Sequence, residues 1–352
     1  MEISVARLAW LQRGRGHRVM VAADQAAPLA QRCASDGIDL FDLREAGPWD
    51  LCGTARLSRL YRRWRPQIVH VHYSKDLHRA APASWLAGRQ GMVFTKHLGS
   101  AVLKKDPWHR LVYGSISRAT AISTFISDNL TETTPLQPEQ IDLVYPGTDV
   151  AAFAPDRKNR AQIRGELGIA DGELAVGMMG RISPGKGFQD FTAMAQGIDR
   201  PGVRFLMIGG ISRDEEAYGT RLRQEAERTL GQRLIFLGFK PDRERYLRAL
   251  DVFAFPSHAE SFGLALCEAM ATGLPCAAYA KDGVLDIITD GQDGLMAKVA
   301  DPDDLGRKIS RLLDEPDTRD RLGLAARQKV IDMFSEERML AGYEETYRKV
   351  AG

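Results

Sequence analysis

The stretch LAVGMMGRISPGKG, residues 174–187, decides the fold of this chain. Its first half is a short apolar run without charges, which predicts a buried strand over 174–180. Its second half is rich in glycine and leads directly into a helix predicted over 188–197. A strand, a glycine-rich turn and a helix in this order are typical of a parallel α/β sheet that binds a ligand at the carboxyl ends of its strands.

The same alternation of strand and helix extends outward on both sides of this stretch. Further strands are predicted at 17–24, 67–72, 92–97, 118–123, 204–210, 234–239, 251–257 and 275–280. Further helices are predicted at 2–13, 54–65, 77–88, 214–230, 262–272, 303–314, 317–333 and 335–350. The fold class is therefore α/β, with two Rossmann-like doubly wound domains that face each other across a ligand-binding cleft.

The length of 352 residues suggests about two domains, at roughly 150 residues for each. Residues 150–172 contain Pro155, several charges and a turn-like Asp-Gly pair, which favours a junction there. We therefore expect an N-terminal domain over 1–150 and a C-terminal domain over 151–334. A final helix over 335–352 is expected to pack back on the N-terminal domain.

The composition excludes several classes of protein. With 44% hydrophobic and 27% charged residues, the chain is neither disordered nor collagen-like. The net charge of +2 argues against a dedicated nucleic-acid binder. Residues 1–150 carry 19 Lys/Arg against 14 Asp/Glu, and this excess of +5 suits either an anionic partner or a solvated face. The four cysteines form no CxxC motif, and no apolar run reaches the roughly 18 residues of a membrane span, so we expect a cytoplasmic protein.

The first candidate site is the loop GRISPGKG, residues 180–187. Glycines such as Gly180 let the backbone approach an anion closely. Arg181 can bind phosphate oxygens with its planar fork, and Lys186 adds a mobile point charge. The alternative is a surface turn that carries two cations without a ligand. The loop is neither a Walker motif nor a GxGxxG fingerprint, so a nicotinamide dehydrogenase is disfavoured.

The second candidate site is PSHAESFGLALCE, residues 256–268, which again lies between a strand and a helix. The free amides at 262–265 would point toward an anion at the start of the helix. Glu260 precedes the helix and Glu268 lies about two turns inside it, and each carboxylate can accept two sugar hydroxyls. The alternative is that Glu260 caps the helix and Glu268 is solvated.

Together the two motifs resemble those of the retaining glycosyltransferases of family 4, which have the two-domain GT-B fold. The resemblance rests on GRxxxxKG at 180–187 and on E-x7-E within PSxxESFGL, and it covers nearly the whole chain. The segments FLGF at 236–239, DVFAFPS at 251–257 and TDGQDGLM at 289–296 also fit. Pro146 stands where the family usually has Asn in an Asn-Gly-x-Asp turn.

The resemblance implies a nucleotide diphosphate sugar as the donor, bound by the C-terminal domain, while the N-terminal domain faces the acceptor. It implies that Arg181 and Lys186 bind the diphosphate, that Glu268 holds the ribose and that Glu260 holds the sugar. The other implied donor contacts are Gly180, the backbone near Phe239 and Lys240 for the base, and the amides of Phe262, Gly263, Leu264 and Ala265 for the sugar and the distal phosphate.

His97, at the end of the predicted strand 92–97, matches the active-site histidine of the family. It is implied to lie beside the sugar ring and to position it as positive charge develops. From the residues alone, a satisfied histidine at a strand end is the alternative, and this interpretation is kept for His70 and His72. The family's reaction retains the anomeric configuration and uses no metal ion, because protein cations and amides stabilise the leaving diphosphate. In the one DxD motif, 301–303, Asp303 is expected to cap a helix.

The function implied is sugar transfer to a glycan or glycolipid of a bacterial surface polysaccharide or lipopolysaccharide. Three alternatives remain: a non-catalytic or impaired sugar-nucleotide-binding protein, a phosphorylase, and an epimerase. Family members open with a hydrophobic strand and a Gly-rich loop before a residue like Glu2, and both are absent here. We therefore expect a truncated chain or an upstream natural start, with unpaired edges on the two strands that would flank the central one.

An anionic membrane is a further candidate partner, at the inner face of the membrane. In TARLSRLYRRWR, residues 54–65, apolar side chains recur at helical spacing among five arginines. Lys104, Lys105 and Arg110 add positive charge nearby in the sequence. The alternative is a helix that packs on the core and leaves its basic back face in water.

Overall fold

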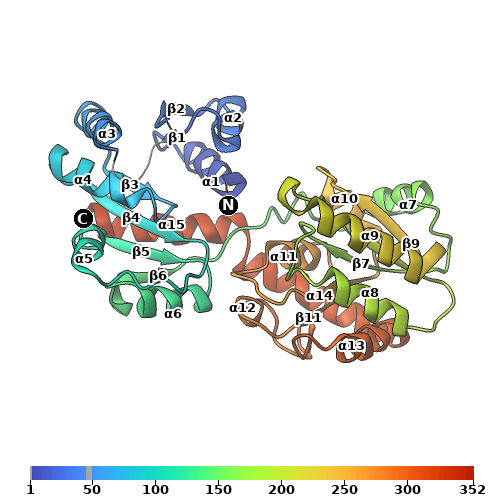
Figure 1. Ribbon diagram of the computed structural model, residues 1–352. Helices are drawn as coiled ribbons and strands as arrows, with labels where there is room; N and C mark the ends of the chain where they lie inside the picture. The colour runs from blue at the N-terminus through green and yellow to red at the C-terminus, as the bar shows by residue number, and fades with distance from the viewer. Residues whose placement is uncertain (1, 45–49) are drawn as a thin grey trace. The chain divides into compact units, whose positions relative to one another are not determined.

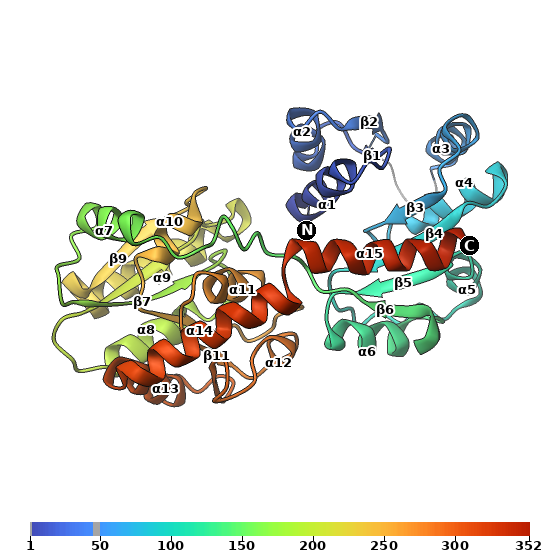
Figure 2. The ribbon, with the colours of Figure 1, turned by 180° about the vertical axis from the view of Figure 1, so that it is seen from behind.

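The computed structural model describes residues 2–44 and 50–352, and the chain divides into two units. The first unit runs to Pro146 and takes up the chain again at Glu337, and the second spans Gly147–Glu336. The first division lies four residues from the junction expected at 150, and the second lies two residues from the one expected at 334. Figure 1 colours the chain by residue number, and Figure 2 shows it from behind.

The second unit contains one six-stranded parallel sheet in the order β12-β11-β10-β7-β8-β9. Its strands are β7 (Leu174–Met179), β8 (Val203–Ile208), β9 (Leu234–Gly238), β10 (Val252–Phe255), β11 (Cys276–Tyr279) and β12 (Leu295–Ala297). Its α-helices are α7 (Arg157–Glu166), α8 (Phe188–Gly197), α9 (Glu216–Leu230), α10 (Arg243–Arg248), α11 (Leu264–Ala271), α12 (Val284–Ile287), α13 (Pro302–Asp314) and α14 (Pro316–Met333). The strand order reverses between β7 and β10, which is where doubly wound sheets bind ligands.

Burial on both faces explains why these strands are almost uniformly apolar. Five of the six residues of β7 are buried, and all four residues of β10 and of β11 are buried. One core cluster joins β7 and β8 to α8, α9 and α13, while α11 and α14 pack against β10 and β11. Phe188, Phe191 and Phe205 are fully buried in this cluster.

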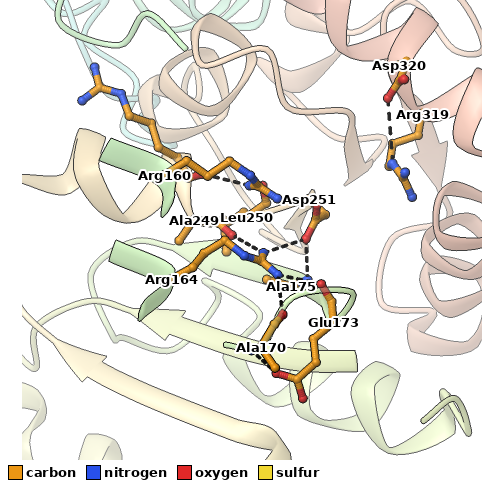
Figure 3. A network of polar contacts seen from close by, with 11 residues as sticks. Arg160, Arg164, Ala170, Glu173, Ala175, Ala249, Leu250, Asp251, Arg319 and Asp320 are labelled. Carbon is orange, nitrogen blue, oxygen red and sulfur yellow. Dashed lines mark hydrogen bonds and ion pairs between the residues drawn. The ribbon is translucent and has the colours of Figure 1, made fainter. Parts of the chain in front are cut away.

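The amino-terminal edge of this sheet is held by Asp251 (Figure 3). Its carboxylate accepts hydrogen bonds from Arg160 at 2.7 Å and from Arg164 at 3.1 Å, both on α7. It also accepts one from the backbone amide of Ala175 at 2.8 Å. Because a partly buried carboxylate needs such partners, Asp251 fixes α7 to the sheet at the end opposite to the candidate ligand loops.

The first unit contains two separate parallel sheets, β1-β2 and β3-β4-β5-β6. The strands are β1 (Met20–Ala23), β2 (Asp39–Asp42), β3 (Ile68–Val71), β4 (Gly91–Lys96), β5 (Arg118–Ala121) and β6 (Ile141–Leu143). The α-helices are α1 (Glu2–Gly14), α2 (Pro28–Ser35), α3 (Leu51–Trp64), α4 (Leu77–Ala87), α5 (Pro107–Tyr113), α6 (Thr124–Thr133) and α15 (Glu336–Ala351). On α15, Met339, Leu340 and Tyr343 pack with Leu8 and Val144 of the first unit.

Local sequence signals account for several helix starts. Asp50 accepts a hydrogen bond from the amide of Gly53 at 2.8 Å at the start of α3, and Ser123 accepts one from Ile126 at 3.2 Å at the start of α6. The expected cap of α13 is wrong by two residues: Asp301, not Asp303, accepts the amide of Asp304 at 2.8 Å. The cause is Pro302, which is suited to the first position of a helix and shifts the cap to the residue before it.

Within the segment 150–172, where the sequence favours a junction, the structure forms the helix α7. The charges that suggested a linker lie on a short surface helix, of which only Ile163 is buried. In the described residues, no helix is both long enough and apolar enough to span a lipid bilayer.

Candidate functional site

The two predicted loops lie side by side at the point where the strand order of the second unit reverses. The loop 180–187 follows β7, and the loop 256–263 follows β10, which pairs directly with β7. Because both strands are parallel, both loops leave from the carboxyl edge of the sheet. The sequence predicted both loops, and their adjacency follows from the strand order.

Gly187 allows the two loops to touch. Its φ angle is +75°, and a Cβ atom there would lie 1.9 Å from the carbonyl oxygen of Pro256. The amide of His258 also donates to the carbonyl oxygen of Gly185 at 2.9 Å. The glycine therefore serves both the backbone turn and the close packing of one loop on the other.

Lys186 and Glu260 form an ion pair between the two loops. The distance from Nζ of Lys186 to Oε2 of Glu260 is 2.5 Å, and both side chains are partly exposed. The Ser257 hydroxyl donates to the same carboxylate oxygen at 3.3 Å. Two residues that the sequence assigned to the diphosphate and to the sugar are thus direct neighbours. Ser257 is an additional residue that sequence reasoning missed, because a serine carries no distinctive signal.

Arg181 is exposed and has no hydrogen bond or ion pair within the described residues. It follows Gly180, whose carbonyl oxygen would lie 1.9 Å from a Cβ atom at Gly209. Because Gly209 has no side chain, the end of β8 can lie close to this loop. The arginine is therefore held at its backbone while its guanidinium stays available to an anion.

The first turn of α11 supplies amides at the same edge of the sheet. Gly263, with φ +124°, precedes the helix, and its carbonyl accepts the amides of Leu266 and Cys267. The amides of Leu264 and Ala265 come before these and make no hydrogen bond within the described chain, as the first turn of a helix requires. Phe262 is buried and packs on Phe334, with ring centroids 5.6 Å apart. Two amides and the positive end of the helix dipole are thus available to an anion.

Glu268 is buried inside α11 and is not solvated, which removes one alternative raised from the sequence. It is 5% exposed, and Nη2 of Arg243 lies 2.9 Å from its carboxylate. Burial raises the pKa of Glu268 to about 7, and the charge of Arg243 opposes this rise. Arg243 lies on α10, near the ring of Phe153, and the sequence motifs did not single it out.

Phe239 and Lys240 follow β9 at the same carboxyl edge. The ring of Phe239 is 76% exposed, and its Cβ lies 3.1 Å from the position of a Cβ at Gly210. Nζ of Lys240 lies 5.2 Å from the ring centroid of Tyr246. An exposed aromatic ring at a strand end can stack on a flat ligand.

A hydrogen-bond network next to the loop after β10 was not predicted from the sequence. Asp190, on α8, accepts a hydrogen bond from the Tyr279 hydroxyl at 2.6 Å and lies 2.9 Å from Nε2 of His258. The rings of His258 and Tyr279 are 5.7 Å apart. The carboxylate thus fixes the loop after β10 to α8 and β11. No local spacing links these three residues, so only the fold could identify them.

His97 lies in the first unit, directly after β4, and its environment is shared with other histidines. Its Nε2 is 3.1 Å from Nδ1 of His72, and burial lowers the pKa of His97 to about 4, so the ring is neutral at pH 7. His70 lies 2.6 Å from the Thr95 hydroxyl and 2.8 Å from the Tyr347 hydroxyl. His70 therefore has a hydrogen-bond partner for each ring nitrogen, whereas His72 also contacts the candidate residue His97.

The comparisons with known proteins identify the family. A family model for glycosyl transferases group 1 matches residues 159–329, and one for Glycosyltransferase Family 4 matches residues 1–152. The D-inositol 3-phosphate glycosyltransferase of Segniliparus rotundus is 30% identical over 319 residues, which cover 80% of this chain and 67% of the relative. The N-acetyl-alpha-D-glucosaminyl L-malate synthase of Bacillus anthracis is 26% identical over 325 residues, 89% of this chain and 82% of the relative.

The fold also matches solved structures. The crystal structure of Anabaena HepE in complex with UDP superposes with a TM-score of 0.87 at 20% identity, over 99% of this chain and 95% of HepE. A sucrose-phosphate synthase from Thermosynechococcus elongatus has a TM-score of 0.74 at 21% identity, over 99% of this chain and 92% of that chain. The predicted fold class, α/β with two Rossmann-like units of the GT-B type, is confirmed.

Proposed function

The chain belongs to the family 4 glycosyltransferases of group 1, and on this basis we propose that it moves a sugar from a nucleotide diphosphate sugar to a glycan or glycolipid acceptor. The observation that supports a donor site is the contact between the loop after β7 and the loop after β10. There Arg181, Lys186 and the amides at the start of α11 gather positive charge at one sheet edge. A diphosphate supplies negative charge for Arg181 and for the helix amides, which have no anionic partner within the described residues.

We propose a protein contact for each part of the nucleotide diphosphate sugar. Arg181 and Lys186 bind the diphosphate, and the amides of Leu264 and Ala265 bind its distal phosphate. Glu268 accepts the ribose hydroxyls and Glu260 those of the sugar. Lys186 then exchanges its contact with Glu260 for a phosphate oxygen, which frees that carboxylate for the sugar. The exposed ring of Phe239 and the backbone near Lys240 lie at the base.

We propose that transfer retains the anomeric configuration and uses no metal ion. The charge that develops on the leaving diphosphate is stabilised by preorganised protein groups, namely Arg181, Lys186 and the helix amides. For His97 we propose a role in transfer itself, where its neutral ring positions the sugar as positive charge develops. Its pKa of about 4 keeps it uncharged under working conditions.

An acceptor with an anionic group is a second candidate, and one observation favours it. Lys96, next to His97, is 3% exposed, and its Nζ has no hydrogen-bond partner within the described residues. Burial lowers the pKa of Lys96 to about 8, because the ammonium lacks solvation. A phosphate or carboxylate would compensate that charge. Two relatives are named for D-inositol 3-phosphate and L-malate, which both carry such groups.

For membrane contact, the loop after His97 is a better candidate than residues 54–65. On α3, Leu57 and Tyr61 are buried, so the apolar side of 54–65 is not available to a bilayer. The loop after His97 exposes Leu98, Val102 and Leu103 by 67%, 64% and 69%, directly before Lys104 and Lys105. We propose this loop as the part that touches an anionic membrane when the acceptor is a glycolipid.

A donor and acceptor screen tests the proposed function. UDP-, GDP- and ADP-sugars are first ranked by the rise in melting temperature, because a ligand of the folded state stabilises it. The best donor is then incubated with a glycolipid, a free glycan, inositol 3-phosphate or malate, with and without EDTA. We expect transfer to one acceptor, an unchanged anomeric configuration by NMR, and no effect of EDTA. Donor binding without release of the nucleotide diphosphate would instead support a non-catalytic binding protein.

A further inference from the structure

A surface hollow of about 620 Å³ lies in the first unit, at the sheet edge where β3 and β4 begin. Its wall combines the last turn of α3 and the two residues before β3 with the turn from α4 into β4 and the end of α15. His97 directly follows β4 and therefore lies at the opposite, carboxyl edge of the same parallel sheet. The hollow is thus separate from the residues assigned to sugar transfer.

The charged side chains in the wall are all positive. Arg62, Arg65 and Arg89 line the hollow, and no Asp or Glu is among the described lining residues. Nε of Arg62 donates to the carbonyl oxygen of Leu86 at 3.2 Å, so this arginine serves the carbonyl end of α4. Arg65 and Arg89 are exposed, and within the described residues they have no hydrogen bond or ion pair. Two guanidinium groups are therefore available to an anion.

Both unpartnered arginines occupy backbone conformations that favour glycine. Arg65 ends α3 with a φ angle of +50°, and Arg89 follows the end of α4 with a φ angle of +57°. The left-handed backbone is unfavourable for residues other than glycine, and helices commonly end on glycine for this reason. Glycine would fit both positions with less strain, so the backbone does not explain the arginines.

The size and the apolar part of the hollow indicate an organic ligand rather than a single inorganic ion. A volume of about 620 Å³ lies in the range of small-molecule sites. Pro66, Val350 and Ala351 supply apolar surface, on which the C–H faces of a sugar or another polyol can pack. The aromatic residue of the described wall, Tyr61, is 6% exposed, so its ring is not open to stack on a nucleobase.

The polar part of the wall indicates that the ligand also carries hydroxyl groups. The Gln90 side chain lines the hollow, and its Nε2 donates to the carbonyl oxygen of Ala87 at 3.1 Å. Its Oε1 is buried and has no hydrogen-bond partner within the described residues. An acceptor without a donor is costly, and a hydroxyl group would supply the donor, whereas a deprotonated phosphate would not.

We propose that this hollow binds a soluble sugar or polyol that carries two phosphate groups. Arg65 and Arg89 each bind one phosphate, and Gln90 accepts a hydrogen bond from a hydroxyl group. The ligand joins the ends of α3, α4 and α15 and thereby stabilises the first unit. Because the hollow lies at the amino edge of the sheet, this ligand is neither the sugar donor nor the acceptor.

Hydrogen exchange locates the binding, and titration calorimetry measures the affinity. The probes are fructose 1,6-bisphosphate, fructose 6-phosphate and phosphatidylglycerol vesicles, each added to the full chain. We expect the bisphosphate to slow exchange in residues 61–67 and 87–91, while the loops 180–187 and 256–263 report separately on the second unit. The monophosphate should bind about tenfold more weakly, because one arginine then lacks its phosphate.

Glycine substitutions separate ligand binding from a structural role of the two arginines. In the double variant Arg65→Gly/Arg89→Gly we expect the affinity for the bisphosphate to fall about 100-fold. The melting temperature should stay the same or rise, because glycine relieves the left-handed backbone. Arg63→Ala is the matched control, since it removes the same charge from α3 at a residue outside the wall, and it should bind the bisphosphate normally.

Three results would overturn the proposal. The first is unchanged exchange at residues 61–67 and 87–91 in the parent chain with saturating bisphosphate. The second is a double variant that melts at a lower temperature and binds as the parent does, because the arginines would then only stabilise the carbonyl ends of the helices. The third is protection of the same residues by the vesicles and not by the bisphosphate, which would assign the arginines to a lipid surface.

Discussion

At the scale of single residues, the proposed donor site contains two cations with different surroundings. Lys186 is held at 2.5 Å by Glu260, whereas Arg181 is exposed and has no partner within the described residues. The lysine side chain is therefore positioned by a neighbouring carboxylate, while the arginine side chain is open to an anion. In the proposed reaction, both cations stabilise the leaving diphosphate, where negative charge grows in the transition state.

Replacement of either cation by alanine should cost catalysis rather than folding. For Arg181→Ala and Lys186→Ala we expect kcat/KM to fall about 10²–10³-fold, the range for loss of one preorganised donor. The melting temperature should change little, since neither side chain is part of the core. Arg223→Ala is the matched control, because Arg223 pairs with Glu227 on the surface of α9 at 2.7 Å. Near-normal transfer by both site variants would contradict the donor assignment.

Glu268 should make stability depend on pH. Its pKa is raised from 4.5 to about 7 in the folded protein. Between these values the unfolded carboxyl has lost its proton while the folded one keeps it, so the free energy of unfolding falls as pH rises. The total loss is about 3 kcal/mol, at 1.36 kcal/mol for each unit of pKa.

Urea unfolding at pH 4.5, 6 and 8 measures this dependence. In Glu268→Gln the fall attributable to residue 268 should disappear, so that the variant gains stability relative to the parent chain as pH rises. The same difference at all three pH values would mean that Glu268 ionises normally. In binding experiments the variant should also lose affinity for the ribose-containing donor more than for inorganic pyrophosphate.

At the scale of elements, the site depends on how closely two loops approach each other. Gly187 and Gly185 both have positive φ angles, +75° and +81°. A Cβ at Gly187 would meet the carbonyl of Pro256, whereas one at Gly185 meets nothing within 4 Å. A comparison of substitutions at Gly185 and Gly187 therefore distinguishes the effect of backbone strain from the effect of the contact between the loops.

Gly185→Ala should cost about 1 kcal/mol of stability, from the left-handed backbone alone. Gly187→Ala should cost a further 1–3 kcal/mol or so, because the two loops must move apart. We also expect the affinity for the donor to fall only in Gly187→Ala, since Lys186 and Glu260 separate with the loops. Thermal unfolding and titration with UDP check both effects, and equal behaviour of the two variants would contradict the role of the contact.

At the scale of the whole molecule, the two units have separate cores and can be followed separately. All five tryptophans lie between residues 10 and 108, so selectively excited tryptophan fluorescence reports on the first unit alone. The residues assigned to the donor, from Gly180 to Glu268, lie in the second unit. Calorimetry records the unfolding of both.

A saturating nucleoside diphosphate should therefore raise the calorimetric transition of the second unit by roughly 5–10 °C at a hundredfold excess over Kd. The transition seen by tryptophan fluorescence should stay where it is. The Lys186→Ala variant should show a much smaller calorimetric shift at the same ligand concentration. A shift of the tryptophan transition as large as the calorimetric one would show that donor binding is not confined to the second unit.

The sequence by itself determined the alternation of strands and helices, the family, and the two loops with their charged residues. These are local properties: apolar runs, glycines between a strand and a helix, and fixed spacings such as that from Glu260 to Glu268. It misplaced the cap of α13 by two residues and did not reveal the helix α7, because short helices and caps depend on marginal local balances.

Only the tertiary structure decided which distant residues meet. The contacts of Lys186 with Glu260, of Glu268 with Arg243, and of Asp190 with Tyr279 join residues 74, 25 and 89 positions apart. The buried state of Glu268, and hence its pKa near 7, also follows from packing and not from its neighbours in sequence. A cavity in the first unit, lined by β1 and β3, is likewise decided by the tertiary structure, because its wall combines residues that lie far apart in the sequence.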